Sequence, residues 1–166
     1  MHNELEFAGY RPGALADVVR LHIDYYSAHW GFGLAFETKV AGELAEFLSR
    51  YDPVADLFLT VYSASGECVG SISLDCESAK GSPDGAHLRW FIVDENYAGR
   101  GVGRQLLEKV LRHGEKTGIN RIWLTTFEGL HAARRLYEEH GFKLVEVRDV
   151  DQWAGGVREQ LFVMQK

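Results

Sequence analysis

Three glycines at alternate positions, Gly99, Gly101 and Gly103, mark the segment of this chain that is best suited to bind an anion. They follow the apolar run 88–93 and lead into the stretch 102–111, whose apolar residues recur at helical spacing. Glycine permits a tight turn and the close approach of a ligand to the backbone. The first amides of a helix lack intrahelical partners, and the helix dipole favours negative charge there. This order of strand, turn and helix start therefore predicts a pyrophosphate site.

The spacing of the glycines narrows the class of ligand. A P-loop needs Lys followed by Ser or Thr, and this turn has no such pair. A dinucleotide fold needs Gly-x-Gly-x-x-Gly and an acidic residue about 20 positions later. Here the glycines read Gly-x-Gly-x-Gly, and the segment at that distance, 119–125, holds no acidic residue. By itself the turn is also compatible with a glycine-rich loop that binds no ligand.

A second segment, 122–142, adds a β-rich run and a helix that stops at Gly141, a residue type favoured after a helix end. Together the two segments resemble the GNAT (GCN5-related) family of acyl-CoA-dependent N-acyltransferases. The family's Gln/Arg-x-x-Gly-x-Gly/Ala pyrophosphate loop is similar to residues 98–103, and its Ala-x-x-Leu-Tyr-x-x-x-Gly-Phe helix is similar to residues 133–142. Residues 11–17 resemble, more weakly, the family's first strand running into its first helix.

More narrowly, residues 126–130 and 152–160 are similar to GNAT domains fused behind MarR-type regulators. No DNA-binding domain of that type is present in the sequence. We therefore expect the acyltransferase part standing alone, as a single domain over residues 1–166.

Two positions depart from the family's pattern. Ala98 stands where the loop usually has Gln or Arg, although Arg100 and Arg104 supply positive charge nearby. Leu130 stands where an Asn is often found. Either a polar contact with the cofactor arm is lost there, or His131 replaces it.

The resemblance implies an N-acetyltransferase that moves an acetyl group from acetyl-CoA to a primary amine by direct attack in a ternary complex. The amine would belong to a small molecule, an amino-acid-like compound or a peptide. A non-catalytic acyl-CoA-binding or sensory module is the alternative, since it would share the phosphate loop but need no acid. The cofactor-binding residues that the resemblance implies are Phe91, Ile92, Val93, Gly99, Arg100, Gly101, Val102, Gly103, Arg104, His131 and Tyr137.

Tyr137 matches the tyrosine that serves the family as general acid, so the resemblance implies that it protonates the leaving CoA thiolate. A phenol, with an ordinary pKa of about 10, suits a basic thiolate. A core tyrosine on an amphipathic helix is the alternative. The resemblance also implies that backbone amides at 91–93 donate to the developing oxyanion.

The base that deprotonates the acceptor is open among His87, Asp75, Glu128, His131 and a chain of waters. We take His87 as the catalytic candidate because its ordinary pKa suits a base. Strand alternation would place it on one face with Arg89, Phe91 and Val93. A structural histidine is the alternative.

Aromatic residues gather where the first two predicted helices meet, and an aromatic wall would attract a charged amine through cation–π contacts. Core or lid packing would explain the same residues. The substrate-binding candidates are Tyr26, His29, Trp30 and Phe32.

Composition bounds the partners. The chain is 46% hydrophobic and 25% charged, with a formal net charge of −6. An acidic surface disfavours nucleic acid and favours a cationic amine. No apolar run approaches 18 residues and no signal peptide is visible, so we expect a cytoplasmic protein with no membrane partner.

Cys68 and Cys76 lack Cys-x-x-Cys spacing and are expected to be buried free thiols in neighbouring strands, and no metal site is expected. A closing hairpin could pair with the edge of a second copy in a homodimer.

The expected order of elements is β-α-α-β-β-β-α-β-α-β-β, a mixed α/β chain. The GNAT resemblance implies a central, twisted, mostly antiparallel sheet of about seven strands flanked by about four helices. The expected helices cover 14–29, 37–51, the stretch after Gly101 and the stretch around Tyr137. The expected strands cover 5–10, 57–62, 68–74, 88–93, the stretch from Ile122, 143–147 and 159–164, with a loop at 80–85.

Overall fold

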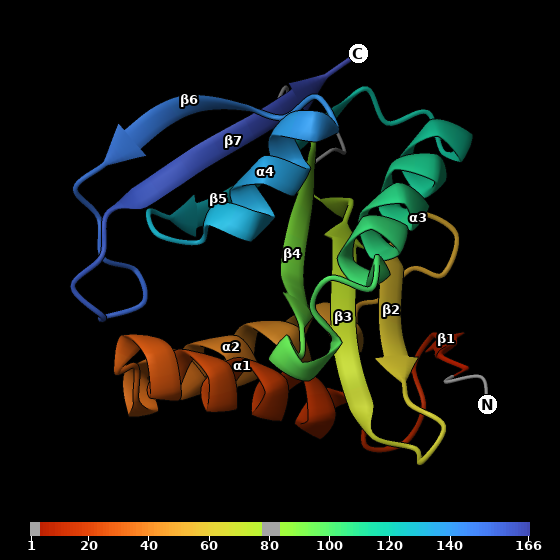
Figure 1. The fold of residues 1–166 in the computed structure, drawn as a ribbon. Helices are drawn as coiled ribbons and strands as arrows, with labels where there is room; N and C mark the ends of the chain where they lie inside the picture. The colour runs from red at the N-terminus through yellow and green to blue at the C-terminus, as the bar shows by residue number, and fades with distance from the viewer. Residues whose placement is uncertain (1–3, 78–83) are drawn as a thin grey trace.

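A seven-stranded sheet forms the frame of the computed structural model, which describes residues 4–77 and 84–166 (Figure 1). The strand order is β1-β2-β3-β4-β5-β7-β6, and the only parallel neighbours among the described strands are β4 and β5. The strands are β1 (Glu6–Ala8), β2 (Leu57–Tyr62), β3 (Cys68–Asp75), β4 (Ala86–Val93), β5 (Arg121–Phe127), β6 (Lys143–Arg148) and β7 (Glu159–Gln165). The helices are α1 (Ala14–Trp30), α2 (Leu34–Ser49), α3 (Val102–Lys116) and α4 (His131–Glu139), with a 3-10 turn at Glu95–Tyr97. The mixed, mostly antiparallel fold is the one expected.

Most element bounds agree with the sequence pattern. The predicted strand 57–62 is observed as β2, and the helix predicted from residue 14 runs to Trp30. The second helix begins at Leu34, three residues before the predicted start, and Gly33 is its N-cap. The additional residues place Phe36 inside the helix, where its side chain is buried in the core. Of the predicted loop 80–85, residues 80–83 lie outside the described residues.

The two helix pairs cover opposite faces of the sheet (Figure 1). Helices α3 and α4 pack on one face through a cluster that includes Leu106, Leu107 and Tyr137. Helices α1 and α2 pack on the other through a cluster that includes Val18 and Phe47. Each fully buried leucine or valine of these clusters contributes about 1.5–3 kcal/mol. Both helix pairs therefore hold their faces firmly against the strands.

The sheet opens between its two parallel strands. β4 and β5 pair only at Ala86 with Ile122 and at His87 with Trp123, and then they diverge (Figure 1). Beyond His87, the edge of β4 that faces β5 has no strand partner among the described residues. Backbone amides on that edge are therefore available to a ligand.

A β-bulge interrupts β4 at Trp90. The register passes from Ser73 opposite Arg89 to Ser71 opposite Ile92, so β4 holds one residue more than β3 in this interval. Trp90 has φ of 49°, a value that is uncommon for a residue with a side chain.

The bulge corrects one prediction. Alternation placed His87, Arg89, Phe91 and Val93 on one face. Phe91 and Val93 pack with the cluster under α3 and α4, whereas Arg89 pairs with Glu43 on α2, across the sheet. The extra residue shifts the alternation by one position. Odd-numbered side chains therefore lie on one face of the sheet before the bulge and on the other face after it.

Neither Cys68 nor Cys76 forms a disulfide within the part of the chain that the structure describes. The prediction that they lie in neighbouring strands was wrong, since Cys68 opens β3 and Cys76 directly follows its other end. Cys68 is also only partly buried, because it sits beside the exposed turn at Gly66.

Candidate active site

A cleft of about 730 Å³ lies along the opened edge of β4. Its floor includes Gly99, Gly101 and Gly103, in the turn that leads into α3. Gly99 and Gly101 both have φ of 77°, in the left-handed region that favours glycine. A Cβ on Gly103 would stand 3.4 Å from Phe91. The glycines therefore serve two purposes, since two shape the turn and the third lets α3 approach the sheet.

Residues 101–104, at the start of α3, line this cleft. The first amides of a helix lack intrahelical partners, and its dipole favours negative charge there. No side chain caps the helix, because its N-cap is Gly101. That this turn binds a pyrophosphate stays a prediction. Opposite the turn, Phe91, Ile92 and Val93 line the cleft from β4.

The two arginines near the turn, Arg100 and Arg104, lie in different positions relative to the cleft. Arg104 lines the cleft and donates to Glu139 Oε2 at 2.6 Å. This pairing holds the pKa of Glu139 below its ordinary value. Arg100 does not line the cleft, and its guanidinium stacks on the Tyr97 ring at 4.9 Å. His131, the first residue of α4, lines the cleft on its far side.

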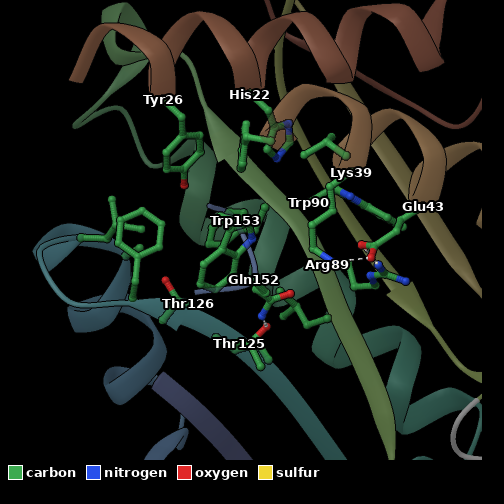
Figure 2. Close-up of a pocket in the computed structure, with 18 of the residues that line it drawn as sticks. His22, Tyr26, Lys39, Glu43, Arg89, Trp90, Thr125, Thr126, Gln152 and Trp153 are labelled. Carbon is green, nitrogen blue, oxygen red and sulfur yellow. Dashed lines mark hydrogen bonds and ion pairs between the residues drawn. The ribbon is translucent and has the colours of Figure 1, made fainter. Parts of the chain in front are cut away.

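A second, smaller cavity of about 140 Å³ adjoins the cleft. Tyr26, Phe91, Leu130 and Ala133 line both, so the two spaces meet at the point where β4 and β5 diverge. Figure 2 shows most of the side chains that enclose it. The lining residues come from α1, α2, β4, β5, α4 and the loop 149–158 before β7. We call these two spaces the cofactor cleft and the acceptor cavity.

Tyr137 lines the acceptor cavity from α4 and is 5% exposed. Burial raises its pKa well above the ordinary value, with a smaller contribution from the nearby Tyr26, so the phenol keeps its proton across the physiological range. The backbone fixes its position. Gly141 N–H donates to the Glu138 carbonyl and Phe142 N–H to the Tyr137 carbonyl, which together form a Schellman motif at the helix end that Gly141 predicted.

His87 also lines the acceptor cavity, with its ring stacked on Trp123 at 3.6 Å between centroids. Burial, aided by the nearby charge of Arg89, lowers its pKa to about 3. Such an imidazole is a weak base at neutral pH. Its catalytic role stays a prediction, which rests on its place in the cavity wall.

The other base candidates lie elsewhere. Burial acts to raise the pKa of Asp75, but the Arg50 guanidinium, which binds both its oxygens at 3.0 and 2.7 Å, leaves that pKa below its ordinary value. Glu128 is exposed and lines neither space. His131 lies in the cofactor cleft. None of these three borders the acceptor cavity.

Of the four predicted substrate residues, Tyr26 lines both spaces. The other three line neither space. Phe32 is buried among aromatic rings and Trp30 packs on Phe127 at 4.8 Å, so these two support the cavity without lining it. His29 is exposed, and its Nε2 donates to Glu95 Oε2 at 2.9 Å beside the cofactor cleft.

Sequence reasoning missed His22, which stands in the acceptor cavity wall (Figure 2). Its Nδ1 lies 2.7 Å from the Val18 carbonyl, and a carbonyl only accepts, so Nδ1 carries the proton. Burial lowers the pKa of His22 to about 4. In the neutral ring Nε2 is then a hydrogen-bond acceptor. The available signal was a histidine inside the apolar stripe of α1.

A group of three charged residues was also missed. Lys39 and Glu43 on α2 meet Arg89 on β4 at one side of the cavity (Figure 2). Lys39 and Glu43 stand four residues apart on one helix face, which was the only signal in the sequence.

Within residues 4–77 and 84–166, no group of three or more metal-ligating side chains could hold a metal ion. In the same ranges, no helix is both long and apolar enough to cross a membrane.

Comparison with known proteins agrees with this architecture. Residues 15–142 match the model of the acetyltransferase (GNAT) family. The spermine/spermidine N(1)-acetyltransferase of Bacillus subtilis is 39% identical over 110 residues, which cover 64% of this chain and 68% of that protein. An uncharacterised N-acetyltransferase of Schizosaccharomyces pombe is 26% identical over 130 residues, covering 78% of this chain and 77% of that one.

Solved structures extend the likeness of fold over nearly the whole chain. A GNAT-family acetyltransferase from Staphylococcus aureus Mu50 superposes with a TM-score of 0.75 at 15% identity, over 98% of this chain and 99% of that one. The family match covers well over half of the sequence. The chain belongs to the acetyltransferase (GNAT) family.

Proposed function

We propose that this protein transfers an acetyl group from acetyl-CoA to the primary amine of a small molecule. One observation carries the proposal: a backbone-lined cleft and a small polar cavity meet at the opened edge of β4, beside the buried Tyr137. The cleft is large enough for an extended nucleotide thioester, and its glycine turn suits a pyrophosphate.

The chemistry follows from these positions. The amine nitrogen, entering from the acceptor cavity, bonds to the thioester carbonyl carbon. Amides on the free edge of β4, around Phe91 to Val93, would donate to the oxygen as its negative charge develops. The carbon–sulfur bond then breaks, and the thiolate takes a proton from the Tyr137 hydroxyl.

The acceptor must also give up a proton. His22 Nε2 would accept a hydrogen bond from the amine and orient it, since that nitrogen carries no proton. Because burial leaves both cavity histidines weakly basic, we propose that the released proton leaves through water. The same route can return a proton to Tyr137.

The extent of the domain is also a proposal. We propose that residues 1–166 act as one domain in the cytoplasm. The narrower resemblance to domains fused behind MarR-type regulators stays a prediction.

Calorimetric titration with acetyl-CoA, using a dephosphorylated pantetheine thioester as control, tests the cofactor cleft. Tyr137→Phe tests the chemistry. We expect turnover to fall about a hundredfold, a usual effect for a general acid, while acetyl-CoA affinity stays the same. Tyr62→Phe is the matched control, because Tyr62 is equally buried but lines neither space.

The outcomes separate the alternatives. Normal turnover of Tyr137→Phe across pH would remove this residue as the acid. Tight binding of acetyl-CoA with no acetyl transfer to any amine would favour the non-catalytic acyl-CoA-binding module. Binding that does not need the pyrophosphate would contradict the assignment of the cleft.

A further inference from the structure

Two cations share one carboxylate on the wall of the acceptor cavity (Figure 2). Lys39 Nζ donates to Glu43 Oε1 at 2.7 Å, and an Arg89 guanidinium nitrogen donates to Glu43 Oε2 at 2.5 Å. Each oxygen of Glu43 therefore already holds a cation. The carboxylate of Glu43 thus lies between two cations, in a position that the carboxylate of a ligand could also occupy.

Arg89 is the fixed member of this group. Its side chain is 16% exposed, and its guanidinium lies over the Trp90 ring at 4.2 Å. Its second nitrogen is 3.6 Å from Asp75, but Asp75 is already bound through both oxygens by Arg50. Asp75 thus holds Arg89 in place while its own charge is shared with another arginine.

Glu43 is the movable member. Its side chain is 41% exposed, so it can rotate toward solvent without breaking the core. The two ion pairs that it forms are partly buried, because the side chains of Lys39 and Arg89 are 29% and 16% exposed. A ligand carboxylate that took the place of Glu43 would receive the same two cations, so the exchange would cost little.

The charge of the wall has the opposite sign to that of the protein. The permanently charged residues that line the cavity are Lys39, Arg89 and Glu43, an excess of one positive charge. The chain as a whole carries −6. A second ammonium group of a polyamine would meet two cations here and a carboxylate that has no free oxygen. An anion would meet a planar guanidinium, which suits a carboxylate in two-point contact.

We propose, resting on the proposed function, that the acceptor is an amino carboxylate, a small molecule with a primary amine and a carboxylate. The amine is placed at Tyr137, and the carboxylate takes the place of Glu43 between Arg89 and Lys39. The cavity volume of about 140 Å³ limits the acceptor to roughly amino-acid size. This acceptor differs in charge from spermine and spermidine, which the Bacillus subtilis relative's name gives for that enzyme.

Matched acceptors test the proposal. Each common L-amino acid and β-alanine is assayed against its own primary amide, with spermidine alongside, by CoA release. The amine of an amide is less basic and more readily attacks at neutral pH, so a preference for the acid cannot arise from amine reactivity. We expect at least one acid to exceed its amide about tenfold in kcat/KM, the worth of one charge-assisted hydrogen bond.

Two variants locate the effect. Lys39→Met should raise KM for the preferred acid about tenfold and leave KM for the amide unchanged. Glu43→Gln removes the competing carboxylate and should lower KM for the acid. Glu37→Gln is its control, because Glu37 lies on the same helix, is exposed and lines neither space. Both Lys39 and Glu43 are partly exposed, so neither variant threatens the fold.

Other outcomes overturn the proposal. Preference for amides or for spermidine would do so, as would equal losses for acid and amide in Lys39→Met. Acetylation of none of these acceptors by a protein that binds acetyl-CoA would count against it too. Acetylation of spermidine alone would leave the proposed acetyl transfer standing, whereas failure to bind acetyl-CoA would remove the proposed function itself.

Discussion

The cofactor cleft and the acceptor cavity adjoin each other but are built by different means. The cleft is shaped mainly by backbone, from the glycine turn, the start of α3 and the free edge of β4. The acceptor cavity is enclosed by side chains from six separate parts of the chain. Backbone recognition depends on φ and ψ, so few substitutions are tolerated. Side-chain recognition can change one residue at a time, so the acceptor can change while the acyl donor is kept.

The largest effect should come from the turn. Gly101→Val places a β-branched residue at φ of 77°, which costs about 1–2 kcal/mol or more and moves the first amides of α3. If two hydrogen bonds to phosphate are lost, each worth about 1.5–3 kcal/mol, affinity for acetyl-CoA should fall at least about a hundredfold. Calorimetry measures the loss.

Gly118→Val is the control for that experiment. Gly118 has the same φ of 77° at the other end of α3, and it lines neither space. Both variants should lose similar stability, but only Gly101→Val should lose acetyl-CoA. Equal affinities in the two would mean that the backbone of the turn does not hold the phosphates.

The same contrast explains what the sequence could and could not predict. The turn is contiguous, so its three glycines predicted the cleft, and Gly141 predicted the end of α4. The bulge at Trp90 left no local signal, because it arises from pairing with β3, about 20 residues away. It places Arg89 and Phe91, which alternation had put on one face, on opposite faces of the sheet.

The acceptor cavity was harder still to predict. His22, Glu43 and Gln152 are far apart in the chain, and each alone is an ordinary helix or loop residue. Aromatic composition did indicate where the cavity lies, but only Tyr26 of the four proposed residues reaches it. Composition locates a cluster, whereas packing decides which of its members face inward.

The next effect should fall on the cavity alone. Gly155, in the loop 149–158, is so close to Phe32 that a Cβ would stand 1.9 Å from the ring. Gly155→Ala must therefore displace this loop, including Gln152 and Trp153, which line the cavity. We expect kcat/KM for the acceptor to fall about tenfold through misplacement, with acetyl-CoA affinity unchanged.

Gly156→Ala is the local control, since a Cβ there meets nothing within 4 Å. This substitution should lower the stability of the protein slightly, because the backbone of residue 156 has φ of 74°, but it should leave the cavity wall in place. A loss of acetyl-CoA affinity in Gly155→Ala would show that the two spaces are not independent.

The buried wall of the cavity should also make stability depend on pH. His22 has a pKa of about 4 in the fold against about 6.5 when unfolded, so folding favours its neutral form. Its stabilising contribution is complete above pH 6.5 and is lost as the pH falls toward 4. At pH 5.5 the loss is about 1 kcal/mol relative to pH 7.5.

Urea unfolding of the wild type and of His22→Gln at pH 7.5 and 5.5 isolates this contribution. Glutamine can keep a donor for the Val18 carbonyl but does not titrate. The variant should therefore lose about 1 kcal/mol less between the two pH values. His87 and the carboxylates titrate in both proteins and cancel in the difference. Identical pH dependence would mean that His22 is not buried in its neutral form.

The smallest effect should come from side-chain charge in the cofactor cleft. Arg104 is about half exposed and paired with Glu139, so Glu139→Gln frees it to approach the phosphates. We expect acetyl-CoA to bind only about two- to threefold more tightly at low salt, and equally at high salt, because exposed pairs are weak and screened. Glu138→Gln is the control, since Glu138 pairs with Arg134 outside the cleft. A gain of tenfold or more would mean that side-chain charge, and not the glycine backbone, dominates phosphate binding, and the distinction between the two spaces would fail.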